Sequence, residues 1–163
     1  MTISVGAELP EATLLTIGEE GPTTVDLGAR LKGRKVVIFG LPGAYTGTCT
    51  TAHVPSFIRT STQFAEKGVD EIICVTVNDP FVCQAWSDMT GAGEVGIAIL
   101  GDADGAFTKA IGMDFTAPPA GLFGRSKRYT MLVDDGVVSL LNEEENPGQC
   151  EISAGETLLD QIT

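Results

Sequence analysis

Basic residues are scarce in this sequence. Its 163 residues include 10 Lys and Arg against 22 Asp and Glu, which gives a formal net charge of −12. Because such a charge repels a polyanion, we do not expect a nucleic acid partner. No apolar run reaches the roughly 18 residues that a membrane span needs, and residues 1–6 lack a basic segment followed by an apolar one. We therefore expect a cytoplasmic protein with no membrane association.

Cysteine and histidine are rare as well. The four cysteines are too few for a secreted disulfide scaffold, which favours a reducing compartment. They are Cys49, Cys74, Cys83 and Cys150. The chain has no Cys-x-x-Cys pair, and a single histidine with four scattered cysteines predicts no metal site. Each thiol is therefore expected either to pack or to react.

Apolar residues, in contrast, are sufficient for one domain over residues 1–163. They make up 43% of the chain, which contains no internal repeat and no Pro/Gly/Ser-rich linker. A chain of this length buries roughly 70% of the surface exposed by its unfolded form. A core can thus form without disulfides or a structural metal.

The apolar pattern predicts strands alternating with helices. We expect strands at 13–17, 25–27, 35–39, 71–77 and 96–100, and a hairpin of strands 129–133 and 137–141 around an Asp-Gly turn. Helices are expected from about 48 to 67, from 80, over 102–112, and after a capping box at Ser153–Glu156. Pro55 should either kink the first of these helices or split off its first turn. Residues 113–127 are expected to be irregular. This order indicates a thioredoxin-like α/β fold with a central mixed β-sheet flanked by helices.

Cys49 carries the strongest chemical signal, because it falls in the first turn of the helix that follows the strand at 35–39. Unpaired N–H groups and the helix dipole stabilise a thiolate at that position. A buried packing role is the commoner fate of a cysteine. The carboxyl end of a parallel strand is, however, where α/β folds place ligands, and this favours a reactive Cys49.

Three neighbours of Cys49 are candidates for supporting roles. The Thr46 hydroxyl can cap the helix or bind a reacting oxygen. Pro42 can shape the loop and shield the thiol from water, or simply form a turn. His53 lies four residues after Cys49, on the same helical face, where it can assist the thiolate or serve structure alone.

A thiolate also needs a fixed cation, and Arg125, Lys127 and Arg128 are candidates. Arginine suits the role because it stays charged and donates from a planar fork. Arg128 directly precedes the strand at 129–133, which would hold it more rigidly than a loop holds the other two. Each of the three could instead be a solvated surface charge.

The motifs together resemble those of a known family. Pro42, Thr46 and Cys49 form the pattern P-x-x-x-T-x-x-C, and the run continues through His53 to Pro55, as in the active-site loop of peroxiredoxins. Residues 68–82 and 125–129 resemble the type II, or peroxiredoxin-5-like, subfamily. The similarity extends along nearly the whole chain.

The resemblance implies a thiol-dependent peroxidase that reduces hydrogen peroxide and alkyl hydroperoxides. Cys49 would attack the O–O bond and become a sulfenic acid. Thr46 would orient the peroxide, Arg128 would stabilise the thiolate and the transition state, and Pro42 would shield the sulfenate. The resemblance implies no cofactor. It also implies a homodimer packed near the active-site loop, with Tyr45, Phe81 and Phe123 as candidate apolar contributors.

The thiol that resolves the sulfenic acid is less defined. Cys150 lies near the C-terminal position of the resolving cysteine in two-cysteine members, and we expect it to be the internal resolver. Cys74 matches a cysteine common in the subfamily, but its mid-strand position favours packing. Cys83 is assigned no role. If neither thiol reaches Cys49, glutathione with glutaredoxin, or a thioredoxin, would resolve it.

Other interpretations were weighed. A cysteine hydrolase needs a His base from another element, whereas His53 shares the helix of Cys49. A redox sensor without turnover stays open, because the same thiolate could signal. The G-x-G-x-x-G pattern at 91–96 follows a helix and precedes a strand, the reverse of a dinucleotide site. The run Glu143–Glu145 predicts a solvated turn.

Overall fold

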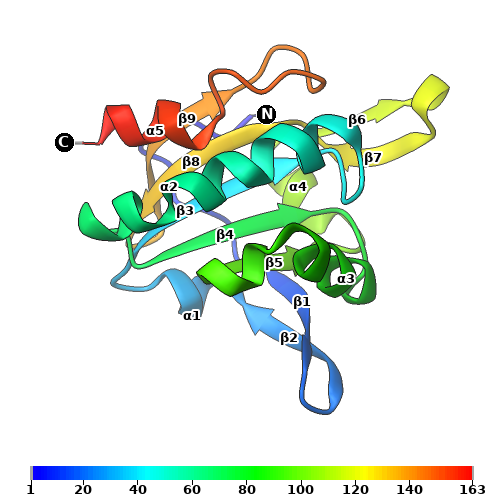
Figure 1. The fold of residues 1–163 in the computed structure, drawn as a ribbon, viewed down its shortest axis with the longest axis horizontal. Coiled ribbons are helices and arrows are strands. Elements are labelled where there is room, and N and C mark those ends of the chain that lie inside the picture. Colours follow the sequence, from blue (N-terminus) through cyan, green and yellow to red (C-terminus); the bar gives the residue numbers. More distant parts are fainter. Residues whose placement is uncertain (1, 163) are drawn as a thin grey trace.

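The computed structural model describes residues 2–162, which form a seven-stranded sheet, a separate two-stranded sheet and helices around them (Figure 1). The strands are β1 (Thr13–Gly18), β2 (Gly21–Asp26), β3 (Lys35–Leu41), β4 (Glu71–Thr76), β5 (Ile97–Gly101), β6 (Asp114–Ala117), β7 (Leu122–Ser126), β8 (Tyr129–Asp134) and β9 (Val137–Glu143). The α-helices are α1 (Leu27–Leu31), α2 (Val54–Glu66), α3 (Pro80–Thr90), α4 (Ala106–Ala110) and α5 (Gly155–Gln161). A π-helical turn, η1 (Cys49–His53), precedes α2, and two 3₁₀ turns are η2 (Ala92–Val95) and η3 (Pro118–Ala120).

The large sheet is mixed, which confirms the expected architecture. Its strand order is β2-β1-β5-β4-β3-β8-β9. Strands β3, β4 and β5 run parallel, and β8 pairs antiparallel with β3. The β8–β9 hairpin turns at Asp135 and Gly136, both with positive φ, as an Asp-Gly hairpin turn requires. A second hairpin, β1–β2, closes the opposite edge.

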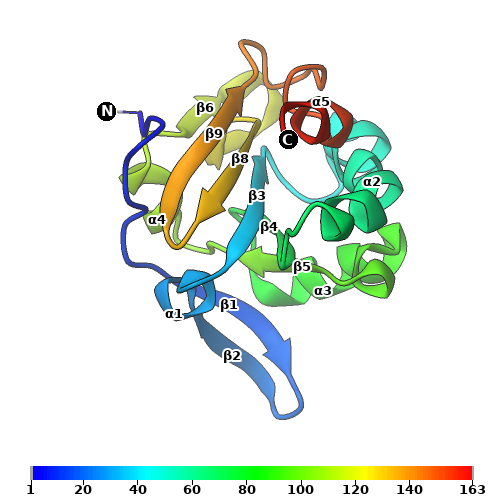
Figure 2. The same ribbon diagram turned by 90° about the vertical axis from the view of Figure 1, so that its left-hand side faces the viewer.

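Helices cover both faces of this sheet (Figure 2). Side chains alternate along β3, so that Val37 and Phe39 join the core beneath α2, α3 and α5, while Val36 and Ile38 face α1 and α4. Both faces of the central strands are therefore buried, which explains why their sequences are continuous apolar runs.

Residues 113–127 correct the expectation of an irregular stretch. They form β6, η3 and β7, a two-stranded ribbon that projects from the body at the right of Figure 1. The segment gives a weak strand signal because the strands are short and separated by Pro118, Pro119 and Gly121.

The expected capping box is also wrong. Helix α5 has Ala154 as its N-cap with no side-chain cap, and the Ser153 hydroxyl instead donates to Glu144. A smaller correction concerns the strand expected at 25–27. Strand β2 ends at Asp26, whose side chain caps α1 by accepting from Ala29 N, so Leu27 begins a helix.

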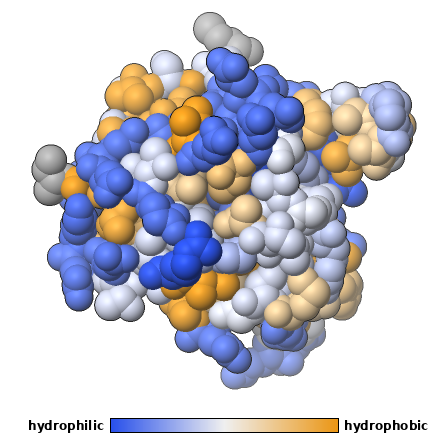
Figure 3. Space-filling model, turned by 45° about the horizontal axis from the view of Figure 1, so that its top comes forward, coloured by the Kyte–Doolittle hydropathy of each residue, from blue (hydrophilic) through white to orange (hydrophobic). Residues whose placement is uncertain are grey.

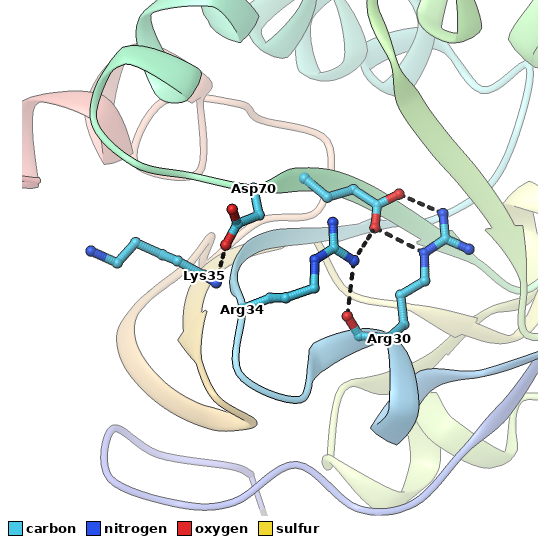
Figure 4. Close-up of polar contacts among 5 residues, drawn as sticks. Arg30, Arg34, Lys35 and Asp70 are labelled. Atoms are coloured by element: carbon cyan, nitrogen blue, oxygen red, sulfur yellow. Dashed lines mark hydrogen bonds and ion pairs between the residues drawn. The ribbon is translucent and has the colours of Figure 1, made fainter.

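Glu71 at the start of β4 pairs with Arg30 in α1 and with Arg34 just before β3, and Figure 4 shows the two arginine side chains pointing toward one carboxylate. Its carboxylate accepts from Arg30 Nε at 2.8 Å and from Arg34 Nη1 at 3.1 Å. Burial raises the pKa of Glu71, but the two guanidinium groups outweigh burial and hold that pKa below its usual range. Lys35 N donates to Asp70 beside this pair. Ion pairs and a hydrogen bond thus hold together the first residues of β4 and the segment that leads into β3.

We predict that Glu71→Gln destabilises the fold by roughly 1 kcal/mol at pH 7, because a neutral amide loses both ion pairs at a half-buried position. Urea unfolding measures the change. Glu156→Gln is the matched control, since its partner Arg59 and Glu156 are 59% and 47% exposed and the pair should contribute little. An equal loss in both variants would contradict the prediction.

Candidate active site

Cys49 lies at the start of a helical stretch beyond the carboxyl end of β3. The helix begins at Gly47, widens into the π turn η1 and continues as α2. Pro55 occupies the first turn of α2 and has no N–H to donate to a preceding carbonyl, and the π turn η1 before it is set off from α2, which matches the expectation of a separate first turn. The Cys49 side chain is fully buried.

The guanidinium of Arg128 is the centre of the site. Its Nη2 donates to Cys49 Sγ at 3.1 Å, its Nη1 to His53 Nδ1 at 2.9 Å, and its Nε to the Pro147 carbonyl at 3.0 Å. Arg128 is 1% exposed and, among the described residues, forms no ion pair with a carboxylate. Of these three partners, only the Cys49 sulfur can carry a compensating negative charge.

Strand pairing brings Arg128 to Cys49 across 79 positions in the chain. Strand β8 runs antiparallel to β3, so Tyr129 at its start lies opposite Gly40 near the end of β3. A Cβ at position 40 would lie 2.3 Å from the Tyr129 ring. The glycine therefore admits the aromatic ring, and Arg128 is placed beside the end of β3, from which the Cys49 loop departs.

His53 is held as a neutral imidazole. Since arginine only donates, His53 Nδ1 must accept, and the ring proton resides on Nε2, which donates to the Ser153 carbonyl at 3.1 Å. Burial, and then the Arg128 charge, hold the pKa of His53 well below its usual range, although the bond to Ser153 opposes this. His53 is thus unsuited to act as a base and supports Arg128 instead.

The loop before Cys49 is fixed by hydrogen bonds. The Thr46 hydroxyl donates to the Gly43 carbonyl at 2.8 Å rather than capping the helix, so its oxygen can still accept a hydrogen bond from a ligand. Asn78 Oδ1 accepts from Ala44 N at 3.0 Å, and Arg125 Nη1 donates to the Pro42 carbonyl at 3.1 Å. Asn78 was not predicted to be part of the site, although it follows the buried parallel strand β4.

A pocket of about 410 Å³ opens beside these groups. Its lining includes Pro42, Thr46 and Arg128, together with the apolar side chains of Phe115 and Leu122 from the β6–β7 ribbon. Residues 146–148 complete the wall. The pocket therefore combines hydrogen-bonding groups next to Cys49 with apolar groups of the ribbon.

Two backbone carbonyls that hold the site were beyond sequence analysis. Pro147 and Ser153 accept from Arg128 and His53 through their main chains, and the identity of a residue gives no signal for such a role. Only the path of the segment from β9 to α5 places them there.

The other three cysteines differ in environment, and none of the four is in a disulfide. Cys74 on β4 is fully buried, and burial, then Cys83 and Cys49, raise its pKa well above the usual value. Burial raises the pKa of Cys83 to about 12. Cys150 is half-buried in the loop after β9, where burial raises its pKa while Ser153 and Arg128 oppose the change. Cys150 is the most accessible of the three.

Residues 2–162 contain neither a candidate metal site nor a membrane-spanning helix. No three His, Cys, Asp or Glu side chains there gather in a way that could hold a metal ion. In the same residues, no helix has the length and apolar character needed to cross a membrane.

Comparison with known proteins gives consistent matches. The family model Redoxin matches residues 4–159. Peroxiredoxin-2E-2, chloroplastic, of Oryza sativa is 44% identical over 161 residues, covering 96% of this chain and 72% of the relative. Peroxiredoxin-2F, mitochondrial, of Arabidopsis thaliana is 45% identical over 140 residues, covering 86% and 69%.

A solved structure agrees with both. Reduced Prx3 of Vibrio vulnificus in complex with H₂O₂ superimposes with a TM-score of 0.90 at 42% identity, covering 99% of this chain and 100% of that one. The fold, the family match and the relatives together show that this chain belongs to the redoxin family and is a peroxidase of the type II, or peroxiredoxin-5-like, peroxiredoxins.

Proposed function

We propose that the chain forms one peroxiredoxin domain in which Cys49 reduces hydrogen peroxide and alkyl hydroperoxides. The observation that carries the proposal is the bond from Arg128 Nη2 to Cys49 Sγ, 3.1 Å long and shielded from solvent. A buried cation without a carboxylate partner favours a thiolate at that sulfur. The family match supports peroxide as the substrate.

In the first step the Cys49 thiolate attacks the terminal oxygen of the hydroperoxide. An S–O bond forms as the O–O bond breaks, the sulfur is oxidised to a sulfenic acid, and the leaving alkoxide or hydroxide takes a proton to become an alcohol or water. Arg128 stabilises the negative charge that spreads over sulfur and oxygens. The Thr46 hydroxyl, which already donates to Gly43, accepts the peroxide O–H. Pro42 in the pocket wall limits access of water to the sulfenate.

In the second step we propose that Cys150 resolves the sulfenic acid. Its thiol would displace hydroxide from the Cys49 sulfur, forming a disulfide and water, and an external thiol would then reduce the disulfide. Greater exposure supports Cys150 over Cys74. Glutathione with glutaredoxin, or a thioredoxin, would supply the electrons. The loop that carries Cys150 lies against the site, because the Pro147 and Gly148 carbonyls accept from Arg128 and Thr48.

We also propose a homodimer formed through the aromatic side chains near the loop. Tyr45, Phe81 and Phe123 are 52%, 64% and 66% exposed. Phe123 lies on the projecting β6–β7 ribbon, which stands out at the right of Figure 3 with part of its surface apolar. Exposed aromatic groups of this size are typical of protein interfaces.

The cellular location stays a prediction. The relatives above carry the names of chloroplastic and mitochondrial proteins, and the cytoplasmic location expected for this chain is a proposal.

We predict that the wild-type protein consumes hydrogen peroxide over many turnovers with dithiothreitol as reductant, and that Cys49→Ser abolishes turnover because no sulfur is left to attack. Peroxide consumption with time is the measurement. Cys83→Ala is the control and should keep the rate within about twofold, since that thiol is buried away from the site. A single stoichiometric oxidation in the wild type would favour the sensor interpretation instead.

For the second step, we predict that the peroxide-oxidised wild type contains a Cys49–Cys150 disulfide. In Cys150→Ser the sulfenic acid should persist and form a glutathione adduct on Cys49 when glutathione is added. Mass spectrometry of digests separates these products. A glutathione adduct on Cys49 of the wild type, with Cys150 free throughout, would contradict internal resolution.

A neutral buried His53 makes stability depend on pH. The unfolded imidazole binds a proton below about pH 6.5, whereas the folded one, with its lowered pKa, does not. Stability is therefore full above that pH and falls on acidification by up to about 1.4 kcal/mol per pH unit. Urea unfolding between pH 7 and 5 should show this slope in the wild type and a smaller one in His53→Gln. Equal slopes would mean that the folded imidazole is protonated normally.

A further inference from the structure

Glu144 is a buried carboxylate to which the proposed reaction gives no role. It was expected to lie in a solvated turn with Glu143 and Glu145, yet it is 5% exposed while Glu145 is exposed. Its Oε2 accepts from Glu151 N, Ser153 N and Ser153 Oγ, each at 2.7 Å. These three donors stabilise the Glu144 carboxylate inside the loop that follows β9.

No cation accounts for this burial. Within residues 2–162, Glu144 forms no ion pair, and Lys127 pairs with Glu143 instead, at 3.6 Å. The carboxylate is therefore stabilised by the three hydrogen bonds, which in turn define the conformation of residues 151–153. A buried carboxylate without these hydrogen bonds would cost its full desolvation penalty. The conformation of the loop that keeps all three bonds is therefore strongly favoured.

The residue that Glu144 holds is itself a partner of the active site. The Ser153 carbonyl accepts from His53 Nε2 at 3.1 Å and from the Thr130 hydroxyl. His53 Nδ1 accepts from Arg128 Nη1, and Arg128 Nη2 reaches Cys49 Sγ. The backbone closes this ring, since Glu144 N donates to the Arg128 carbonyl at 3.0 Å.

The donors and acceptors in this closed chain of hydrogen bonds can be assigned in only one way. The Ser153 carbonyl must accept, so His53 Nε2 must donate, and His53 Nδ1 is left to accept from Arg128. If the Ser153 carbonyl moves away, the imidazole is no longer fixed in this tautomer and orientation. The Arg128 fork then loses a partner that holds it against the sulfur.

We propose that Glu144 is a positioning residue for peroxide reduction, acting through the Ser153 carbonyl and His53 to keep the Arg128 guanidinium against Cys49. This inference rests on the proposed function of Cys49. Glu144 touches neither the peroxide nor the sulfur. Its effect arises from reach and hydrogen-bond acceptance, so a glutamine, whose amide oxygen can take the place of Oε2, preserves it, whereas an aspartate, which withdraws the acceptor by one methylene, does not.

The test is a single-turnover measurement on four variants of the whole chain: Glu144→Ala, Glu144→Gln, Glu144→Asp and the matched exposed control Glu145→Ala. Reduced protein is mixed with hydrogen peroxide without reductant. Fluorescence of the single tryptophan, Trp86, whose Nε1 donates to Thr50 next to Cys49, follows the reaction. Mass spectrometry of quenched samples confirms oxidation at Cys49, and urea unfolding reports the folded fraction.

We expect Glu144→Ala to lower the second-order rate constant by roughly 10- to 100-fold, as a misplacement of about 1 Å at the reacting groups does. Glu145→Ala should stay within about twofold of the wild type, and Glu144→Gln should recover most of the lost rate. Glu144→Asp should react more slowly than Glu144→Gln, although it keeps the charge. That order separates positioning from a simple electrostatic effect.

Two results would overturn the inference: a folded Glu144→Ala that is oxidised as fast as the wild type, or Glu144→Asp equal to or faster than Glu144→Gln. The second comparison decides the matter if Glu144→Ala does not fold. A wild-type protein whose Cys49 is not oxidised would overturn the proposed function itself, and this outcome is distinct from both.

Discussion

The burial of one guanidinium group is the constraint on which the rest of the site depends. Arg128 is withdrawn from water, and its charge finds no carboxylate among the described residues. A buried cation is tolerated only when its donors are satisfied and its charge is compensated. His53 and Pro147 satisfy two arms of the fork, and the Cys49 sulfur offers the site for the compensating charge. The reactivity proposed for Cys49 therefore follows from the burial of Arg128.

The fold supplies this arrangement through strand pairing. Parallel strands β3, β4 and β5 direct their carboxyl ends to one edge, where ligand sites of α/β proteins lie. Antiparallel β8 brings its beginning to the same edge, and with it Arg128. Gly40 has no side chain to block the Tyr129 ring at this point, and this allows Arg128, the residue before Tyr129, to lie close to the end of β3.

The segment from Glu144 to Ser153 connects the two halves of the proposed catalytic cycle. It braces Arg128 and His53 through the carbonyls of Pro147 and Ser153, and it also carries Cys150. The segment proposed to prepare Cys49 for oxidation is thus the same one that carries the proposed resolving thiol.

The sequence alone determined much of this protein. The run at 35–39, the Asp-Gly turn after Asp134 and the pattern from Pro42 to Cys49 are local signals, because strand propensity, turn geometry and a helix start depend on neighbouring residues. Arg128 could be nominated for the same reason, as a charge fixed by the strand that follows it. Only the tertiary structure decided which arginine meets the sulfur, that residues 113–127 form a ribbon, that Ser153 does not cap α5 and that Glu144 is buried. Each of these depends on partners far apart in the chain and on backbone carbonyls, which every residue type presents alike.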